Sequence, residues 1–153
     1  MEYYERELRN KNRGSMNLIV WQKAMELFEM VWKFAYAESK IDFKLRAQFA
    51  DAAQSISSNI AEGYGRRSVK EYIQFPYVAL GSLAEALTRG MGLHRTRQVS
   101  QRIRDFDLLR HEVENQLLRL IEKLGRNVMT EIGSRGWPRI HPNTPFLYHS
   151  ITP

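Results

Sequence analysis

Apolar residues recur at spacings of three and four along four stretches of the chain, as they do on one face of an α-helix. The stretches are 17–37, 42–62, 68–91 and 100–124. No stretch shows the alternation of apolar and polar residues that marks a half-buried strand. Four helices of roughly 20 residues with short connections favour an up-and-down antiparallel bundle. We therefore expect an all-α four-helix bundle.

The positions expected to face the core follow from these periods. In chain order they are Leu18, Trp21, Met25, Phe28, Trp32 and Ala35; Leu45, Phe49, Ala52, Ala53, Ile56 and Ile60; Ile73, Tyr77, Leu80, Leu83, Ala84, Leu87 and Met91; and Ile103, Phe106, Leu109, Val113, Leu117, Leu120 and Leu124.

Three polar residues are placed to begin helices. Asp42 and Ser100 are suitable N-caps, because their side chains can accept the unpaired backbone N–H groups of a first turn. Ser68 followed by Glu71 has the spacing of a capping box.

Glycine and proline predict the interruptions. Gly63 and Gly65 can adopt the left-handed conformation that closes a helix, and Gly125 is placed to end the fourth helix. Pro76 lies inside the third helix, where it removes a hydrogen bond and collides with the preceding turn. We expect a kink near residues 72–76.

The chain divides into three parts by composition. We expect a flexible extension over 1–15, the bundle over 16–126, and an irregular tail over 127–153 that is rich in glycine and proline. Met1 and Met16 are both possible starts of the protein. Aromatic residues in the tail favour its partial docking on the bundle.

The composition excludes several classes of protein. The chain has 153 residues and no cysteine, which excludes disulfides and sulfur-ligated zinc. We see no signal peptide and no apolar run near the roughly 20 residues that a membrane span needs. A cytoplasmic protein is the simplest interpretation.

The net charge of +6 is concentrated in one segment. Residues 63–104 hold eight Lys and Arg but only Glu71 and Glu85, so 8 − 2 gives +6 there. Such a surface suits a phosphate backbone or an acidic partner. The residues expected to contact RNA or DNA are Arg66, Arg67, Lys70, Arg95, Arg97, Arg102 and Arg104.

Catalytic and metal-binding patterns are missing from the sequence. The Glu-x-x-His pairs of di-iron bundles and the Gly-x-Ser-x-Gly nucleophile elbow do not occur. We expect no enzyme activity, no metal and no cofactor. Polar residues beside the apolar stripes favour instead a structural hydrogen-bond network of Gln22, Asn59, Glu62 and Arg89.

Three motifs resemble one family. They are Leu18-x-x-Trp21-Gln22-Lys23-Ala24, Ser55-Ile56-x-x-Asn59-Ile60-Ala61-Glu62-Gly63 and Gly81-Ser82-Leu83-Ala84-Glu85. Over residues 17–126 the chain resembles the 23S rRNA intervening-sequence proteins of bacteria. It departs from their pattern at Pro76, at Gly90 and Gly92, and in its long C-terminal tail.

The resemblance implies a non-enzymatic four-helix bundle that assembles as a ring-like homopentamer. Relatives of the family serve as accessory proteins of reverse transcriptases, where basic surfaces contact nucleic acid and the polymerase. Two functions therefore stay open: binding of RNA or DNA, and a protein-interaction scaffold that docks an acidic partner such as a reverse transcriptase.

Overall fold

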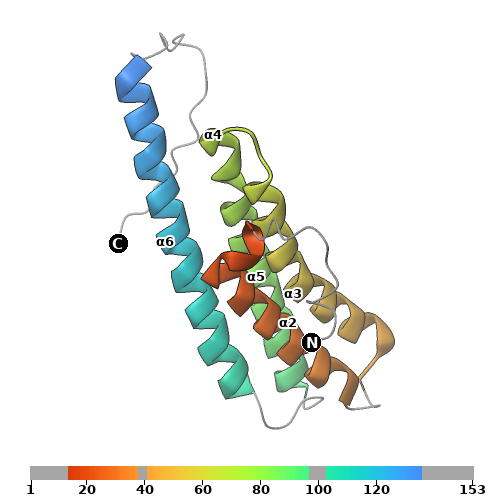
Figure 1. Cartoon of the computed structure of the whole chain (residues 1–153). Coiled ribbons are helices and arrows are strands. Elements are labelled where there is room, and N and C mark those ends of the chain that lie inside the picture. The colour runs from red at the N-terminus through yellow and green to blue at the C-terminus, as the bar shows by residue number, and fades with distance from the viewer. Residues whose placement is uncertain (1–13, 38–40, 97–102, 136–153) are drawn as a thin grey trace, which may run out of the picture.

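The computed structural model describes residues 14–37, 41–96 and 103–135. They form a short 3-10 helix η1 (Ser15–Asn17) and the α-helices α2 (Ile19–Ala37), α3 (Phe43–Tyr64), α4 (Val69–Tyr72), α5 (Gln74–Arg95) and α6 (Ile103–Arg135). The described residues contain no strand. Neighbouring long helices run antiparallel (Figure 1), which confirms the predicted four-helix bundle.

Each long helix packs against two others. The neighbouring pairs are α2 with α3, α3 with α5, α5 with α6, and α6 with α2. The α3–α4 connection lies at one end of the bundle, and the C-terminal ends of α2 and α5 lie at the other end (Figure 1).

Two of the predicted N-caps are confirmed. The Asp42 carboxylate accepts the backbone N–H groups of Lys44, at 2.9 Å, and Leu45, at 3.2 Å. The Ser68 hydroxyl accepts the backbone N–H of Glu71 at 3.2 Å, which is one of the two hydrogen bonds of a capping box. Ser100 lies outside the described residues.

The prediction that Gly63 and Gly65 adopt a left-handed conformation at the end of α3 is wrong. Gly65 has φ −77° and ψ −4°, a right-handed conformation, and Gly63 lies within the helix. Gly63 is needed for a different reason: an added Cβ would lie 2.6 Å from the Cβ of Phe75 and 2.9 Å from the ring of Tyr72. The missing side chain therefore lets α4 and α5 pack closely on α3.

Pro76 does more than kink the third helix. The helix divides at Ile73 into α4 and α5, and Pro76 becomes the third residue of α5. Backbone N–H groups in a first turn have no helical partner, so proline there leaves no hydrogen bond unmade. The break thus removes most of the cost of a proline inside a helix.

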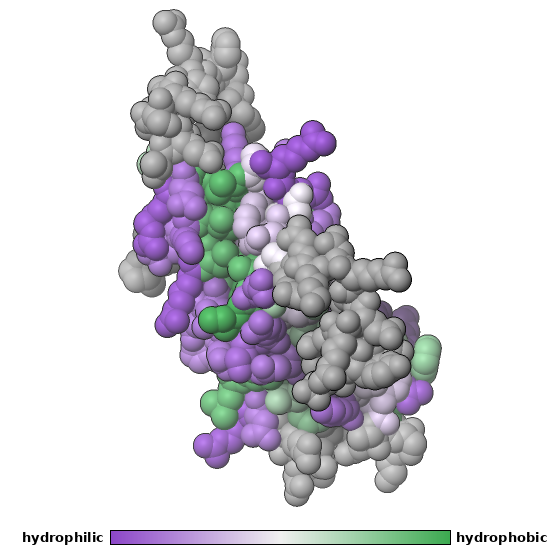
Figure 2. All heavy atoms as spheres, viewed as in Figure 1, coloured by the Kyte–Doolittle hydropathy of each residue, from purple (hydrophilic) through white to green (hydrophobic). Residues whose placement is uncertain are grey.

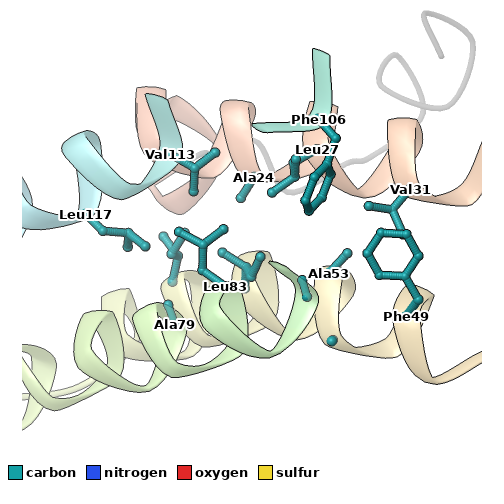
Figure 3. Packing of buried hydrophobic residues seen from close by; sticks show 14 of the residues in the cluster. Ala24, Leu27, Val31, Phe49, Ala53, Ala79, Leu83, Phe106, Val113 and Leu117 are labelled. Carbon is teal, nitrogen blue, oxygen red and sulfur yellow. The ribbon is translucent and has the colours of Figure 1, made fainter. Parts of the chain in front are cut away.

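The core lies between all four long helices (Figure 3). In the core, Phe49 of α3 meets Phe106 of α6 edge-to-face, with ring centroids 5.6 Å apart. A Cβ on Gly90 of α5 would lie 3.1 Å from the Phe49 ring and 3.5 Å from the Phe106 ring. Gly90 therefore makes room for both rings.

The predicted core face is right for α3 except at Leu45, which is 41% exposed, and for α6 except that Ile121 is also buried. On the other two helices it is displaced, and of the predicted positions only Ala35 and Leu83 are buried. On α2 the buried stripe is Val20, Ala24, Leu27, Val31 and Ala35, whereas Trp32 is exposed. On α5 the buried positions are Pro76, Ala79, Ser82, Leu83, Ala86, Gly90 and Leu93. Both helices carry a second apolar stripe, and the prediction favoured the bulkier side chains. The interior holds the smaller ones because the helices pack closely.

The fourth helix does not stop at Gly125. It continues to Arg135, so the first nine residues of the predicted irregular tail, 127–135, are helical. A glycine inside a helix costs only about 1 kcal/mol relative to alanine. Burial of the flanking Leu124 offsets that cost. The predicted extension over 1–13 and the tail over 136–153 lie outside the described residues.

Two glycine substitutions test the helix contacts. Gly63→Ala should destabilise the fold by about 1–3 kcal/mol, because its Cβ would overlap Phe75. Gly125→Ala should stabilise it by about 0.5–1 kcal/mol, since its Cβ would meet only an Ile73 methyl group at 3.9 Å. Urea unfolding followed by circular dichroism measures both. Equal effects of the two substitutions would contradict this description of the α3–α5 contact.

Candidate nucleic-acid interface

The structure separates the expected nucleic-acid-binding residues into two groups. Arg66, Arg67 and Lys70 lie at the α3–α4 connection and are called the basic corner below. Arg95 ends α5 and Arg104 begins α6. The 22 residues of α5, about 33 Å at 1.5 Å per residue, separate the two groups (Figure 1). Arg97 and Arg102 lie outside the described residues.

Within the basic corner, Arg66 is held by an ion pair, whereas Arg67 and Lys70 have no carboxylate partner among the described residues. Arg66 pairs with Glu62, one turn earlier on α3, and its guanidinium lies 4.4 Å from the centroid of the Phe75 ring. Arg67 and Lys70 are exposed, and neither forms an ion pair with any described residue. Their charges are free to meet a phosphate.

Two tyrosines adjoin the basic corner. Tyr64 is 45% exposed and contacts Tyr72 edge-to-face, with ring centroids 6.1 Å apart. A Cβ on Gly14 would overlap the Tyr64 ring, so the chain before η1 packs closely on it. Burial raises the pKa of Tyr72, and the neighbouring Tyr64 adds to the rise. The Tyr72 phenol thus stays neutral and does not offset the positive charge of the corner.

At the opposite end of the bundle, Arg95 and Arg104 are both exposed. Neither forms an ion pair within the described ranges 14–37, 41–96 and 103–135. Each group has an acid next to it in the sequence: Asp105 follows Arg104, and Glu71 follows Lys70. The basic segment therefore forms two separate groups of cations and not one continuous face.

The predicted polar network of Gln22, Asn59, Glu62 and Arg89 does not form among the described residues. Gln22 donates to the carbonyl of Met16 at 2.9 Å, which ties α2 to η1. Glu62 points outward to Arg66. The helical period turns Glu62 away from the core stripe of α3, and this explains the error.

Arg89 joins α5 to α3 by a different route. Its guanidinium donates to Glu85 at 2.7 Å and to the Gln48 side chain at 2.8 Å. These bonds lie at the surface and do not reach the other three residues of the predicted network.

A smaller network links α3 to α5 instead. Asn59 donates its side-chain amide to the carbonyl of Ser55 at 2.7 Å and to the Ser55 hydroxyl at 3.0 Å. That hydroxyl lies 3.0 Å from the hydroxyl of Ser82, which is buried on α5. Small hydroxyl residues at this crossing allow the two helices to approach and still satisfy their polar atoms.

An aromatic surface on α2 was missed by the sequence analysis. Phe28, Trp32 and Tyr36, the aromatic ladder, follow one another at i+4 spacing along the helix. The Trp32 and Tyr36 rings stack with centroids 4.2 Å apart and planes at 27°. Phe28 lies 6.0 Å from Trp32 at 57°. The spacing was visible in the sequence, but Phe28 and Trp32 were assigned to the core.

The ladder borders a shallow groove of about 320 Å³ lined by Phe28, Glu29, Trp32 and Lys33. One carboxylate oxygen of Glu29 is buried and has no hydrogen-bond partner among the described residues. The part of the chain that the structure describes contains no group of three His, Asp or Glu placed to hold a metal ion. No described helix is both long and apolar enough to cross a membrane.

Comparison with solved structures gives the fold independently. A crystal structure of a protein of unknown function from the S23 ribosomal protein family of Bacteroides thetaiotaomicron VPI-5482 superposes with a TM-score of 0.62. The two chains are 23% identical, and the match covers 67% of this chain and 98% of the other. At this identity the likeness establishes the fold alone. No curated protein matches the chain.

Comparison with family models identifies the family. The model of the 23S rRNA-intervening sequence protein matches residues 16–129, more than half of the chain. This match includes all three motifs that carried the resemblance and all four long helices up to residue 129. The chain belongs to the family of 23S rRNA-intervening sequence proteins.

Proposed function

We propose that this protein acts without catalysis, as a self-associating helical bundle that binds RNA or DNA through its exposed cations. The observation that carries the proposal is the availability of Arg67, Lys70, Arg95 and Arg104. Other cations of the bundle, such as Arg89 and Arg110, are neutralised by carboxylates one turn away on their own helices. Cations without a carboxylate partner are suited to phosphates.

Binding of this kind contacts the phosphate backbone and does not depend on the base sequence. The cations lie on exposed surfaces at both ends of the bundle, and no described cleft encloses them. A flexible, multiply charged strand can meet such a surface in many registers. Each phosphate contact releases condensed counterions, so the affinity should fall steeply as salt rises.

The outer face of α5 supports self-association. Tyr77, Val78, Ala84 and Met91 are exposed on this helix, whose central part carries no charges besides the Glu85–Arg89 pair. The face shown in Figure 2 is largely hydrophilic along α6, although Leu108, Leu118 and Met129 of that helix are also exposed. Exposed apolar surface of this extent on a small domain is typical of a contact with another molecule.

Two glycines on α5 point to the same conclusion. A Cβ on Gly81 or Gly92 would meet nothing within 4 Å, so the packing of this chain alone does not require either glycine. Each costs about 1 kcal/mol relative to alanine inside a helix. A second helix that approaches closely on this face would account for both.

The size of the face fits a modest interface. A helix about 33 Å long and 10 Å wide offers roughly 330 Å², and the neighbouring outer face of α3 about doubles it. Stable interfaces bury about 800 Å² on each partner. A homopentameric ring, the assembly that the family resemblance implies, would repeat the basic corner around one axis and strengthen binding through avidity.

A charge reversal tests the phosphate contacts. Arg67→Glu should weaken binding of a structured RNA about ten-fold near 0.1 M salt and lower the slope of log K against log salt by about one. The measurement is fluorescence anisotropy between 50 and 200 mM salt. Arg126→Glu, the same charge change at an exposed arginine of α6 that already pairs with Glu122, is the matched control. An affinity of the unmodified protein that does not change with salt would contradict the proposal.

A charge placed on α5 tests self-association. Val78→Glu should dissociate the assembly, because Val78 is 52% exposed in one copy and would be buried against another. Light scattering measures the mass. Leu118→Glu, at a similarly exposed apolar residue of α6, should leave the mass unchanged. If the unmodified protein is monomeric at tens of micromolar, the self-association part of the proposal is wrong.

A further inference from the structure

Phe28 of the aromatic ladder packs partly buried against the core, whereas Trp32 and Tyr36 lie outside it. The core stripe of α2 consists of Val20, Ala24, Leu27, Val31 and Ala35. Trp32 and Tyr36 lie on another side of the helix and keep 49% and 38% of their surface exposed. Phe43, at the start of α3, is 68% exposed. Phe43 therefore forgoes most of the stabilisation that burial would provide, and Trp32 and Tyr36 forgo a third to a half of it.

Cations lie between and beside these rings. The Arg46 guanidinium lies 5.1 Å from the Tyr36 ring centroid and 5.3 Å from the Phe43 ring centroid. No described carboxylate pairs with Arg46, and its Nε is buried without a hydrogen-bond partner. Lys33 and Lys44 are exposed and form no ion pair among the described residues. This surface therefore alternates flat apolar rings with uncompensated positive charge.

Two described acids lie near these rings, Asp42 and Glu29, and they are differently engaged. Asp42 accepts two backbone N–H groups as the cap of α3. Glu29 lines the groove beside Trp32, where a carboxylate can accept a hydrogen bond from a base amino group but cannot bind a phosphate. The phosphate path would therefore follow the side of Lys44 and Arg46.

We propose that the aromatic ladder, Phe43 and the cations Lys33, Lys44 and Arg46 form a binding site for single-stranded nucleic acid. Unpaired bases stack on the exposed faces of Trp32 and Phe43, and the phosphates between them meet the cations. Every base offers a flat face, so this stacking does not depend on sequence. In a duplex those faces are already covered by neighbouring bases. The inference rests on the proposed function and adds a preference for unpaired strands.

The charges favour a nucleic acid over a second protein copy on this surface. The buried centre of a protein interface is depleted in charged residues. Another copy would have to bring carboxylates against Lys33, Lys44 and Arg46 to avoid burying three unpaired cations. A strand that carries one phosphate per base supplies the missing negative charge.

The test compares two probes on the full chain. The probes are a fluorescein-labelled 12-nucleotide oligo(U), which has unpaired bases, and an RNA duplex of the same length. Trp32→Leu should weaken oligo(U) binding about 5- to 100-fold, the range that removal of one stacking ring produces. Duplex affinity should stay within two-fold. Binding of oligo(U) should also quench tryptophan emission in the unmodified protein and quench it less in the variant.

Two further variants keep the test decisive. Phe43→Leu, at the most exposed of the rings, should show the same selective loss and covers the case that Trp32→Leu does not fold. Leu118→Ala removes an equally exposed apolar side chain on α6 and should change neither affinity.

The outcomes separate the two proposals. If the unmodified protein binds both probes and Trp32→Leu and Phe43→Leu weaken neither, the stacking site is wrong while the phosphate-binding function stands. If the unmodified protein binds neither probe, the proposed function itself fails. A change of solution mass in Trp32→Leu would assign the ladder to self-association and overturn the inference.

Discussion

The packing of the bundle depends on the contact between Phe49 and Phe106, which joins two diagonally opposite helices across the bundle axis. The two rings come from α3 and α6, helices that are not neighbours in the bundle, and they meet where Gly90 leaves α5 without a side chain. One aromatic contact thus holds three helices together near the end where Arg46 and Arg104 lie. Any larger residue at position 90 would separate the rings and loosen that end of the structure.

A second constraint decides where the charge lies. Pro76 divides the third helix at Ile73, and the short α4 folds the basic corner over the end of α3. The rest of that helix, α5, then carries the chain to the opposite end before Arg95. The sequence gathers its net charge in one segment, but the fold distributes this charge over both ends. The proposed binding of an extended polyanion would therefore involve two places on the bundle.

Much of the fold followed from the sequence, because the helical period and the caps act locally. Asp42 and Ser68 begin helices as expected, and the buried residues of α6 other than Ile121 match its predicted stripe. The prediction fails where two apolar stripes on one helix could face the core with similar local energies. Trp32 and Val31 both belong to apolar stripes of α2, and only the spacing between helices decides that Val31 enters the core. The Asn59–Ser55–Ser82 network depends on such a contact between helices, so periodicity could not show it. The i+4 spacing of the aromatic ladder was visible in the sequence, but periodicity could not show that Trp32 and Tyr36 stack outside the core.

The measurement that tests the central claim most directly is the solution mass of the full chain, alone and with structured RNA, at 50 and 200 mM salt. The account predicts an oligomer that gains the mass of bound RNA at low salt and loses most of it at the higher salt, while the protein assembly itself persists. An oligomer whose mass does not change with RNA at either salt would contradict nucleic-acid binding and favour a protein scaffold. A monomer whose mass does not change with RNA would contradict both self-association and nucleic-acid binding.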